Sequence, residues 1–165
     1  MVKTHRDTIS VNDCQVLAHY QFEADQYIIT LESKEIADST RPGQFVHLSV
    51  SGMLAMRRPI SVMSVDADNG TFDLLYKIVG EGTKQLADRK IGDVLSVIGP
   101  IGNGFELTDR KIPLLIGGGV GMPPMIAIAQ KIKDNAYYNP YVILGSEVPF
   151  PFEASQSSLS GFNSS

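Results

Sequence analysis

From residue 10 to about residue 108, apolar and polar residues alternate along short segments, which is the pattern of half-buried β-strands. The alternating or apolar segments are 27–32, 46–50, 72–78 and 94–98. Turn-forming residues separate them, namely Arg41-Pro42-Gly43, Asp68-Asn69-Gly70, Gly92-Asp93 and Gly99-Pro100. Short strands at this spacing favour a β-sandwich or a barrel over an array of βαβ units. Only Thr83–Lys90 has helical character here, with Thr83 as its N-cap.

Near residue 109 the pattern changes to one that is typical of an α/β fold. Residues 112–116 form a fully apolar run of the kind that is buried in a parallel sheet. A glycine-rich loop follows, and a helix is predicted from Met122–Pro123, because proline fits the first turn of a helix. Apolar residues then recur at helical spacing, namely Met125, Ile128, Ala129 and Ile132. With a second strand over 141–144, the segment predicts one βαβ unit of nucleotide-binding type.

These patterns predict a β domain over residues 1–108 and a partial nucleotide-binding α/β domain over residues 109–148. A Pro/Phe-rich and then Ser-rich tail over residues 149–165 is expected to be disordered. One βαβ unit cannot cover both faces of a parallel sheet, so we expect further chain or a partner to complete the second domain. The Phe150/Phe152 segment is expected to be an exposed edge against which such structure packs.

Composition and charge exclude several classes of function. The 165 residues are 43% hydrophobic and carry a net charge of −4, so nucleic acid is disfavoured as a partner. Cys14 is the only cysteine, which excludes an intrachain disulfide and a Cys-ligated iron–sulfur or zinc site. We expect Cys14 to be buried, and its solitary occurrence suits the cytoplasm.

The remaining general signals are negative. No signal peptide is expected in the first ten residues, and no membrane span is expected in the uncharged stretch 112–130, because glycines and prolines interrupt it. His5, His19 and His47 have no acidic partner at ligand spacing, and no G-x-S-x-G motif occurs. We therefore predict no metal site and no catalytic residue.

Two segments carry candidate ligand chemistry. Arg58-Pro59-Ile60-Ser61 combines a guanidinium fork that matches phosphate oxygens with a hydroxyl that could donate to the edge of a flavin. The run Leu75-Tyr76-Lys77 leads through Gly80 and Gly82 to Thr83, a helix start whose free N–H groups attract anions. Taken singly, each segment is better explained without a ligand, the first as an exposed arginine and the second as a capped strand-to-helix turn. Together they favour a site for the pyrophosphate of a flavin dinucleotide.

The loop Gly117–Gly121 follows a predicted buried strand and opens a helix, which is the context of a phosphate or nicotinamide cradle. Its spacing does not match G-x-G-x-x-G, because Met122 and Pro124 stand where a third glycine is required. A tight strand–helix turn without a ligand is the alternative. The segment 99–105 is either a turn that leaves the β domain or part of a cleft between the two domains.

Four motifs in order resemble those of the ferredoxin-reductase-like flavoproteins, and within them the electron transfer subunits of dihydroorotate dehydrogenase. The motifs are RRPISV at 57–62, LYKIVGEGT at 75–83, GPIGNGF at 99–105 and LIGGGVGMPPM at 115–125. The resemblance extends from about residue 8 to residue 150. It implies a six-stranded antiparallel FAD-binding β-barrel followed by a partial NAD-binding βαβ domain.

The resemblance also implies cofactor-binding residues. Those expected at the pyrophosphate and flavin edge of FAD are Arg58, Pro59, Ile60, Ser61, Gly82 and Thr83. Those expected along the flavin ring are Leu75, Tyr76 and Lys77. Those expected to face a nicotinamide nucleotide are Gly118, Gly119, Gly121 and Pro123.

In that family, electrons pass from dihydroorotate through FMN on a catalytic subunit, a [2Fe–2S] centre and FAD to NAD, as a step of pyrimidine biosynthesis. The cysteines of the [2Fe–2S] centre are absent from this sequence, and the predicted NAD site is incomplete. Two alternatives to an electron-transfer subunit stay open. One is a stand-alone NAD(P)H-dependent flavin or ferredoxin reductase, and the other is an interaction module that has lost its redox role.

Overall fold

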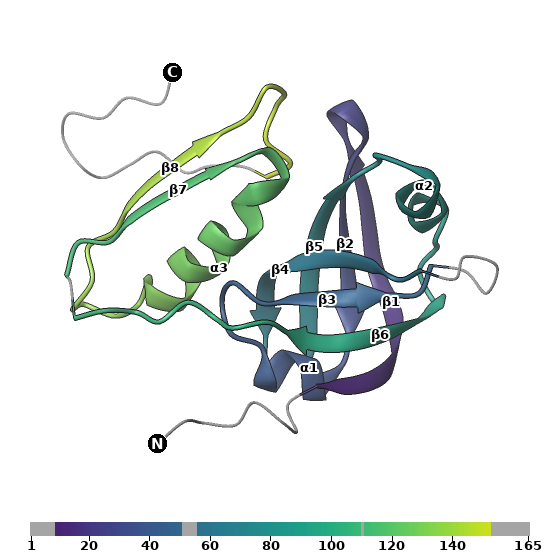
Figure 1. Ribbon diagram of the computed structural model, residues 1–165, viewed down its shortest axis with the longest axis horizontal. Helices are drawn as coiled ribbons and strands as arrows, with labels where there is room; N and C mark the ends of the chain where they lie inside the picture. The colour runs from purple at the N-terminus through teal and green to yellow at the C-terminus, as the bar shows by residue number, and fades with distance from the viewer. Residues whose placement is uncertain (1–8, 51–55, 110, 153–165) are drawn as a thin grey trace.

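A closed barrel of six antiparallel strands forms the first unit of the computed structural model, which describes residues 9–50, 56–109 and 111–152 (Figure 1). Around the barrel the strand order is β1-β2-β5-β4-β3-β6. The strands are β1 (Ser10–Phe22), β2 (Gln26–Glu32), β3 (Phe45–Leu48), β4 (Arg58–Asp66), β5 (Thr71–Lys77) and β6 (Val94–Ile101). The prediction of a barrel is confirmed. The sequence pattern predicted a turn at Gly99-Pro100. The structure places these two residues within β6 instead.

The barrel core follows from the alternation of side chains along each strand. Phe72, Leu74 and Tyr76 of β5 point inward and are buried, and Lys77 at the end of the strand is exposed. Each fully buried large apolar side chain contributes about 1.5–3 kcal/mol to folding. Cys14 lies in the same core, as predicted, and burial raises the pKa of its thiol to about 12.

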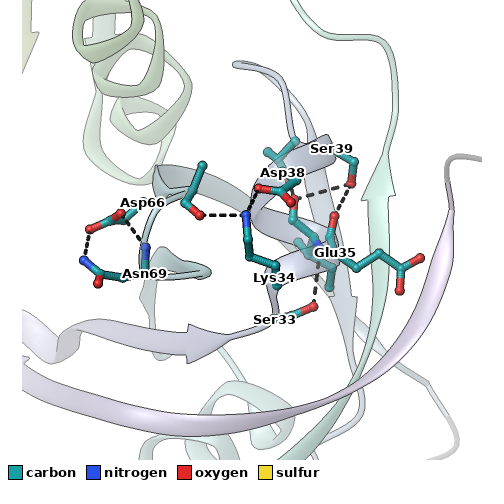
Figure 2. A network of polar contacts seen from close by, with 10 residues as sticks. Ser33, Lys34, Glu35, Asp38, Ser39, Asp66 and Asn69 are labelled. Carbon is teal, nitrogen blue, oxygen red and sulfur yellow. Dashed lines mark hydrogen bonds and ion pairs between the residues drawn. The ribbon is translucent and has the colours of Figure 1, made fainter.

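Two short helices differ from the sequence prediction. The sequence pattern gave no indication of α1 (Lys34–Ser39), which begins after Ser33, whose hydroxyl accepts the Ile36 N–H at 3.3 Å. Figure 2 shows how Lys34 anchors this helix, because its ammonium contacts Asp38 and donates to the Ala67 carbonyl at 2.9 Å. In the same figure Asp66 closes the adjoining turn by accepting from Asn69.

The helix that was predicted at Thr83 is α2 (Glu81–Ala87), and its N-cap is Gly80. Thr83 is the third helical residue, so its prediction as the N-cap was wrong. The backbone explains the difference: Gly80 has the extended conformation that an N-cap adopts, and the Thr83 hydroxyl bonds back to Gly80. Helix α2 lies across one end of the barrel (Figure 1).

The second unit is a parallel pair of strands with one helix. Strand β7 (Leu114–Gly118) leads through the short helix η2 (Gly119–Gly121) into α3 (Met122–Ile132), and β8 (Tyr141–Gly145) follows. The helix begins where the sequence predicted, whereas β7 begins at Leu114 and not at residue 112. Helix α3 lies between the two-stranded sheet and the barrel (Figure 1).

Helix α3 has two apolar sides, and each packs against a different unit. Ile128 and Ile132 pack with Leu115 of β7. Met122 forms a second cluster with Met63 of β4 and Leu75 of β5. The helix therefore joins the two-stranded sheet to the outer wall of the barrel, and the strand pair is positioned by this contact.

The side chains on the opposite face of the β7–β8 sheet are exposed in the described part of the structure. Leu114, Ile116, Tyr141 and Ile143 are each between 41% and 63% exposed. Parallel sheets are normally covered on both faces. The prediction that one βαβ unit leaves a sheet face open therefore agrees with the described part of the structure.

The segment that follows β8 returns to the barrel. Phe152 packs against the Met63–Leu75–Met122 cluster, and the Gln26 amide donates to the Pro149 carbonyl at 3.3 Å. Residues 149 and 152 thus contact the barrel and its cluster, and residues 153–165 lie outside the described part, so the disordered tail over 149–165 stays a prediction. The predicted domain boundaries at 108 and 148 stay predictions. No described helix is long and apolar enough to cross a membrane.

Polar groups are also buried at the end of the barrel that α2 covers. The Arg89 carbonyl can only accept, so His19 Nδ1 donates to it at 2.8 Å and Nε2 accepts from the Tyr76 hydroxyl at 2.8 Å. The Tyr27 ring stacks on the Tyr76 ring at 5.3 Å, and burial raises the pKa of Tyr76. This network links β1 and β5 to the end of α2.

We expect Tyr76→Phe to lower the free energy of unfolding by about 1–2 kcal/mol, because it leaves His19 Nε2 without its donor. Urea denaturation followed by circular dichroism measures the change. The matched control is Tyr20→Phe, since Tyr20 is 60% exposed. Equal stability of the two variants would contradict the role assigned to the network.

Candidate functional site

Arg58 and Gly82 form the closest packing at the candidate site. Arg58 begins β4, and Gly82 is buried in the first turn of α2. A Cβ atom placed on Gly82 would lie 1.8 Å from Arg58 Nε and 2.5 Å from Cζ. Only glycine therefore lets the guanidinium lie against this turn of the helix.

The guanidinium of Arg58 keeps most of its donors available. Among the described residues its hydrogen bond is from Nη1 to the Met56 carbonyl at 3.0 Å. A guanidinium has five N–H donors in a planar fork, so the remaining donors can bind a phosphate oxygen. No carboxylate forms an ion pair with it in the described part of the chain.

The turn before α2 adds backbone N–H groups to this charge. The Thr83 hydroxyl accepts from the N–H groups of Val79 and Gly80 at 2.9 and 3.3 Å and donates to the Gly80 carbonyl at 3.1 Å. The hydrogen bonds of the Thr83 hydroxyl thus stabilise the turn. The N–H groups of Glu81, Gly82 and Thr83 have no acceptor within the helix, because they belong to its first turn.

Ser61 lies on the outer face of the barrel. It is half-buried in β4 opposite Phe45 of β3, whereas the neighbouring Ile60 points into the core. Pro59 is exposed at the start of the same strand, opposite His47. The structure thus places Arg58, Pro59 and Ser61 along the first half of β4, and Arg58 contacts Gly82 of α2.

The side chains of residues 75–77 differ in how exposed they are. Leu75 is 2% exposed and packs against Met63 and Met122, and the Tyr76 side chain points into the barrel. Only Lys77 is exposed. Leu75 and Tyr76 can therefore offer backbone groups to a ring, and Lys77 alone offers an exposed side chain. That these three residues line a flavin stays a prediction.

A cleft of about 690 Å³ opens between the two units at the carboxyl ends of β7 and β8. Gly118 and Gly119 line one side, and Gly119 has a φ of +52°, which favours glycine. Lys77 and Gln26 of the barrel line the other. Ligands of parallel sheets bind in the crevice outside the carboxyl ends of the strands, so this cleft is the expected nucleotide position.

The other two residues predicted for a nucleotide do not line this cleft. Gly121 is the exposed N-cap of α3, and Pro123 is buried in the first turn of that helix. Pro123 therefore shapes the helix start and does not line the cleft.

Sequence patterns did not point to some residues at the site. Gln26 and Glu147 line the cleft, but neither belongs to a motif. Met63 and Met122 bring β4 to α3, and methionine has no distinctive pattern either. Their roles depend on contacts between segments that are distant in sequence. In the described part of the chain, no group of three or more His, Cys, Asp or Glu residues could hold a metal ion.

Comparison with known proteins identifies the family. Residues 13–105 match the model of the oxidoreductase FAD-binding domain, so the chain belongs to the oxidoreductase FAD-binding domain family. The match covers β2 to β6 and most of β1. It therefore includes Arg58, Ser61 and the turn at Gly82.

The related proteins include electron transfer subunits of dihydroorotate dehydrogenase B (NAD(+)). The subunit of Enterococcus faecalis is 37% identical over 123 residues, which are 72% of this chain and 47% of the relative. That of Bacillus cereus is 40% identical over 111 residues, which are 64% of this chain and 43% of the relative. The chain thus spans about half the length of these relatives.

Solved structures share the fold. The NADH-dependent reduced ferredoxin-NADP oxidoreductase has a TM-score of 0.76 and 28% identity over 90% of this chain and 51% of its own. The ferredoxin reductase of carbazole 1,9a-dioxygenase has a TM-score of 0.71 and 23% identity, over 84% of this chain and 43% of its own. These likenesses confirm a ferredoxin-reductase-like barrel with part of a nucleotide domain.

The residues fit the FAD that the family name implies. Among the described residues, a guanidinium with donors to spare, three N–H groups of a first helical turn and a glycine that permits close approach lie together at the start of β4. This donor set suits a pyrophosphate, whose oxygens are acceptors with negative charge. The half-buried Ser61 lies on the outer face of the same strand.

Gly82→Ala tests this fit. We expect it to weaken FAD binding by about tenfold or more, because the added Cβ displaces the Arg58 guanidinium and a charge-assisted hydrogen bond is worth about 1.5–3 kcal/mol. Titration with FAD, followed by flavin fluorescence, measures the affinity.

Gly80→Ala is the matched control. No atom lies within 4 Å of a Cβ placed on Gly80, and its φ of −179° suits any residue. Circular dichroism checks that both variants are folded. If Gly82→Ala bound FAD as tightly as Gly80→Ala, the Arg58–Gly82 contact would have no part in binding.

Proposed function

We propose that this chain is an FAD-binding electron-transfer unit that works with a dihydroorotate-oxidising flavoprotein and exchanges electrons with NAD. The observation that carries the proposal is the guanidinium of Arg58 against Gly82, on the same barrel whose Lys77 faces the nucleotide cleft. The names of its relatives supply the dihydroorotate system and NAD(+). The reaction would belong to pyrimidine biosynthesis in the cytoplasm.

The protein contributes position and charge. FAD, when bound, supplies hydride exchange with a nicotinamide and single-electron transfer to a partner. Arg58 and the N–H groups of the first turn of α2 would hold the pyrophosphate. The Ser61 hydroxyl, on the outer face of β4, would donate to the flavin edge. No acid or base of the chain is required by this chemistry.

The wall next to this site is apolar and closed. Met63, Leu75 and Met122 are each at most 8% exposed. Their cluster packs the first turn of α3 against β4 and β5. A flavin on the outer face of β4 would thus have an apolar neighbour on the side of α3.

The cleft offers charges of both signs to a nicotinamide nucleotide. Lys77 can contact its phosphates, and Gly118 and Gly119 let its backbone approach closely. Glu147 follows the carboxyl end of β8 and lines the same cleft. An acidic side chain near this place in a nucleotide-binding fold bonds the ribose 2′-hydroxyl of NAD and repels the 2′-phosphate of NADP.

The central experiment compares the wild type with Arg58→Met. We expect Arg58→Met to raise the dissociation constant of FAD by about tenfold or more, since it removes a charge-assisted contact. Arg41→Met is the matched control, because Arg41 is an exposed arginine that lines neither the cleft nor the contact with Gly82. Unchanged FAD affinity in Arg58→Met would overturn the pyrophosphate assignment.

Two further measurements on the FAD-loaded protein distinguish an electron-transfer subunit from a stand-alone reductase and from an interaction module. Under anaerobic conditions, NADH should bleach the flavin absorbance of the FAD-loaded wild type. The loaded chain should also co-elute with the FMN-containing catalytic subunit of Enterococcus faecalis in gel filtration. Bleaching without co-elution would favour a stand-alone reductase, and failure to retain FAD would favour a non-catalytic interaction module.

The choice of nucleotide gives a separate prediction. We expect the FAD-loaded wild type to be reduced faster by NADH than by NADPH, and Glu147→Gln to lower this preference by about tenfold, because it removes a repelling charge. Anaerobic stopped-flow absorbance measures both rates. Glu106→Gln is the control, since Glu106 is exposed and does not line the cleft. An unchanged rate ratio in Glu147→Gln would contradict the role of this carboxylate.

A further inference from the structure

A second cavity of about 280 Å³ lies between the barrel and α3. It shares no lining residue with the cleft at Lys77. Three segments that are distant in sequence form its walls: the connection between α1 and β3, the second half of β4 with the residue that follows it, and the last turns of α3. The lining residues are Thr40, Arg41, Pro42, Val62, Ser64, Val65, Ala67, Ala127, Gln130 and Lys131.

The charge of this α3 cavity is opposite to that of the chain. Arg41 and Lys131 line it and no acidic residue does, although the chain has a net charge of −4. In the described part of the structure, neither the Arg41 guanidinium nor the Lys131 ammonium forms an ion pair or a hydrogen bond. Both cations are therefore available to an anion.

Acidic residues occur only in an adjoining hollow. That hollow shares Ser64, Val65, Ala67 and Gln130 with the α3 cavity, and its charged lining residues are Asp66, Asp68, Asp73 and Lys133. The Asp73 carboxylate accepts from Thr30 at 2.7 Å and from Ser64, and Asp66 accepts from Asn69. None of these four charged residues lines the α3 cavity, so the charges on the lining of the α3 cavity are those of Arg41 and Lys131.

The rest of the lining suits an apolar body with a few polar edges. Pro42, Val62, Val65 and Ala127 supply apolar walls. The Thr40 hydroxyl donates to the Ile36 carbonyl at 2.6 Å and keeps its lone pairs as acceptors. The Gln130 amide can both donate and accept. Ligand cavities commonly combine apolar walls with a small number of placed polar groups.

We propose that the α3 cavity binds a small organic monoanion with a flat apolar body, of the aromatic carboxylate class. Its carboxylate contacts Arg41 and Lys131, and its body lies between Pro42 and Ala127. Such a ligand would bridge the barrel and α3, because Arg41 belongs to the former and Lys131 to the latter. Binding would therefore stabilise the packing of α3 on β4 and, through the first turn of α3, the position of the Gly118–Gly121 loop.

The probe for this proposal is benzoate, with benzyl alcohol as its uncharged analogue. We expect benzoate to shift the backbone amide NMR signals of Ala127 and Gln130, and to bind about tenfold or more tightly than benzyl alcohol. Arg41→Met together with Lys131→Met should remove this preference. The control is Lys133→Met, which removes a cation from the adjoining hollow and should leave benzoate binding unchanged.

Two results would overturn the proposal. One is the absence of any shift of the lining amides at saturating benzoate. The other is equal binding of benzoate by the wild type and the double variant, which would mean that the cations take no part. FAD titration of the double variant verifies that it is folded, because Arg41 and Lys131 lie outside the residues assigned to FAD. The proposal does not rest on the proposed function.

Discussion

The packing of Met122 against Met63 and Leu75 is the contact on which the arrangement of the site depends. It is the point where the first turn of α3 meets two barrel strands, and it is almost fully buried. Because η2 and β7 lead directly into this turn, the contact fixes the glycine loop opposite Lys77. Removing it would separate the loop from the barrel. Both units would then keep their own cores, but the cleft between them would be lost.

The barrel itself contributes rigidity where a ligand would need it. Arg58 and Ser61 lie on a strand that pairs with β3 and β5, and residues 75–77 lie on β5, which pairs with β2 and β4. Side chains on paired strands are held more precisely than side chains on loops. Helix α2 joins this frame through the Arg58–Gly82 contact and through the His19 bonds to Tyr76 and the Arg89 carbonyl.

Much of the fold could be predicted from local pattern, and the exceptions have physical causes. Strand β5 and helix α3 follow from alternation and from proline at a helix start, which are properties of neighbouring residues. Helix α1 could not be predicted in this way. It has only two buried residues, Ile36 and Ala37, and such a short helix shows little periodicity. The N-cap of α2 was predicted three residues too late in the sequence. Threonine is a common N-cap residue, but here the Thr83 hydroxyl bonds to the actual N-cap, Gly80.

The candidate site was predicted less completely than the fold. Arg58, Gly82 and Lys77 could be named because their chemistry is visible in the residue types. Strand alternation predicts that Tyr76 lies on the same face of β5 as Phe72 and Leu74. Which face of the strand is the inner one is known only from the closed barrel. Gln26 and Glu147 could not be found, because the cleft that they line exists only when α3 packs on β4. The α3 cavity depends on the same packing.

The most direct test of the central claim, that the outer face of the barrel holds FAD, is the visible absorbance spectrum of the purified wild-type chain. The protein should be incubated with excess FAD, separated from it by gel filtration, and then denatured so that any released flavin can be identified. The account predicts flavin absorbance in the protein peak and FAD as the released species. A colourless protein that circular dichroism shows to be folded would contradict it.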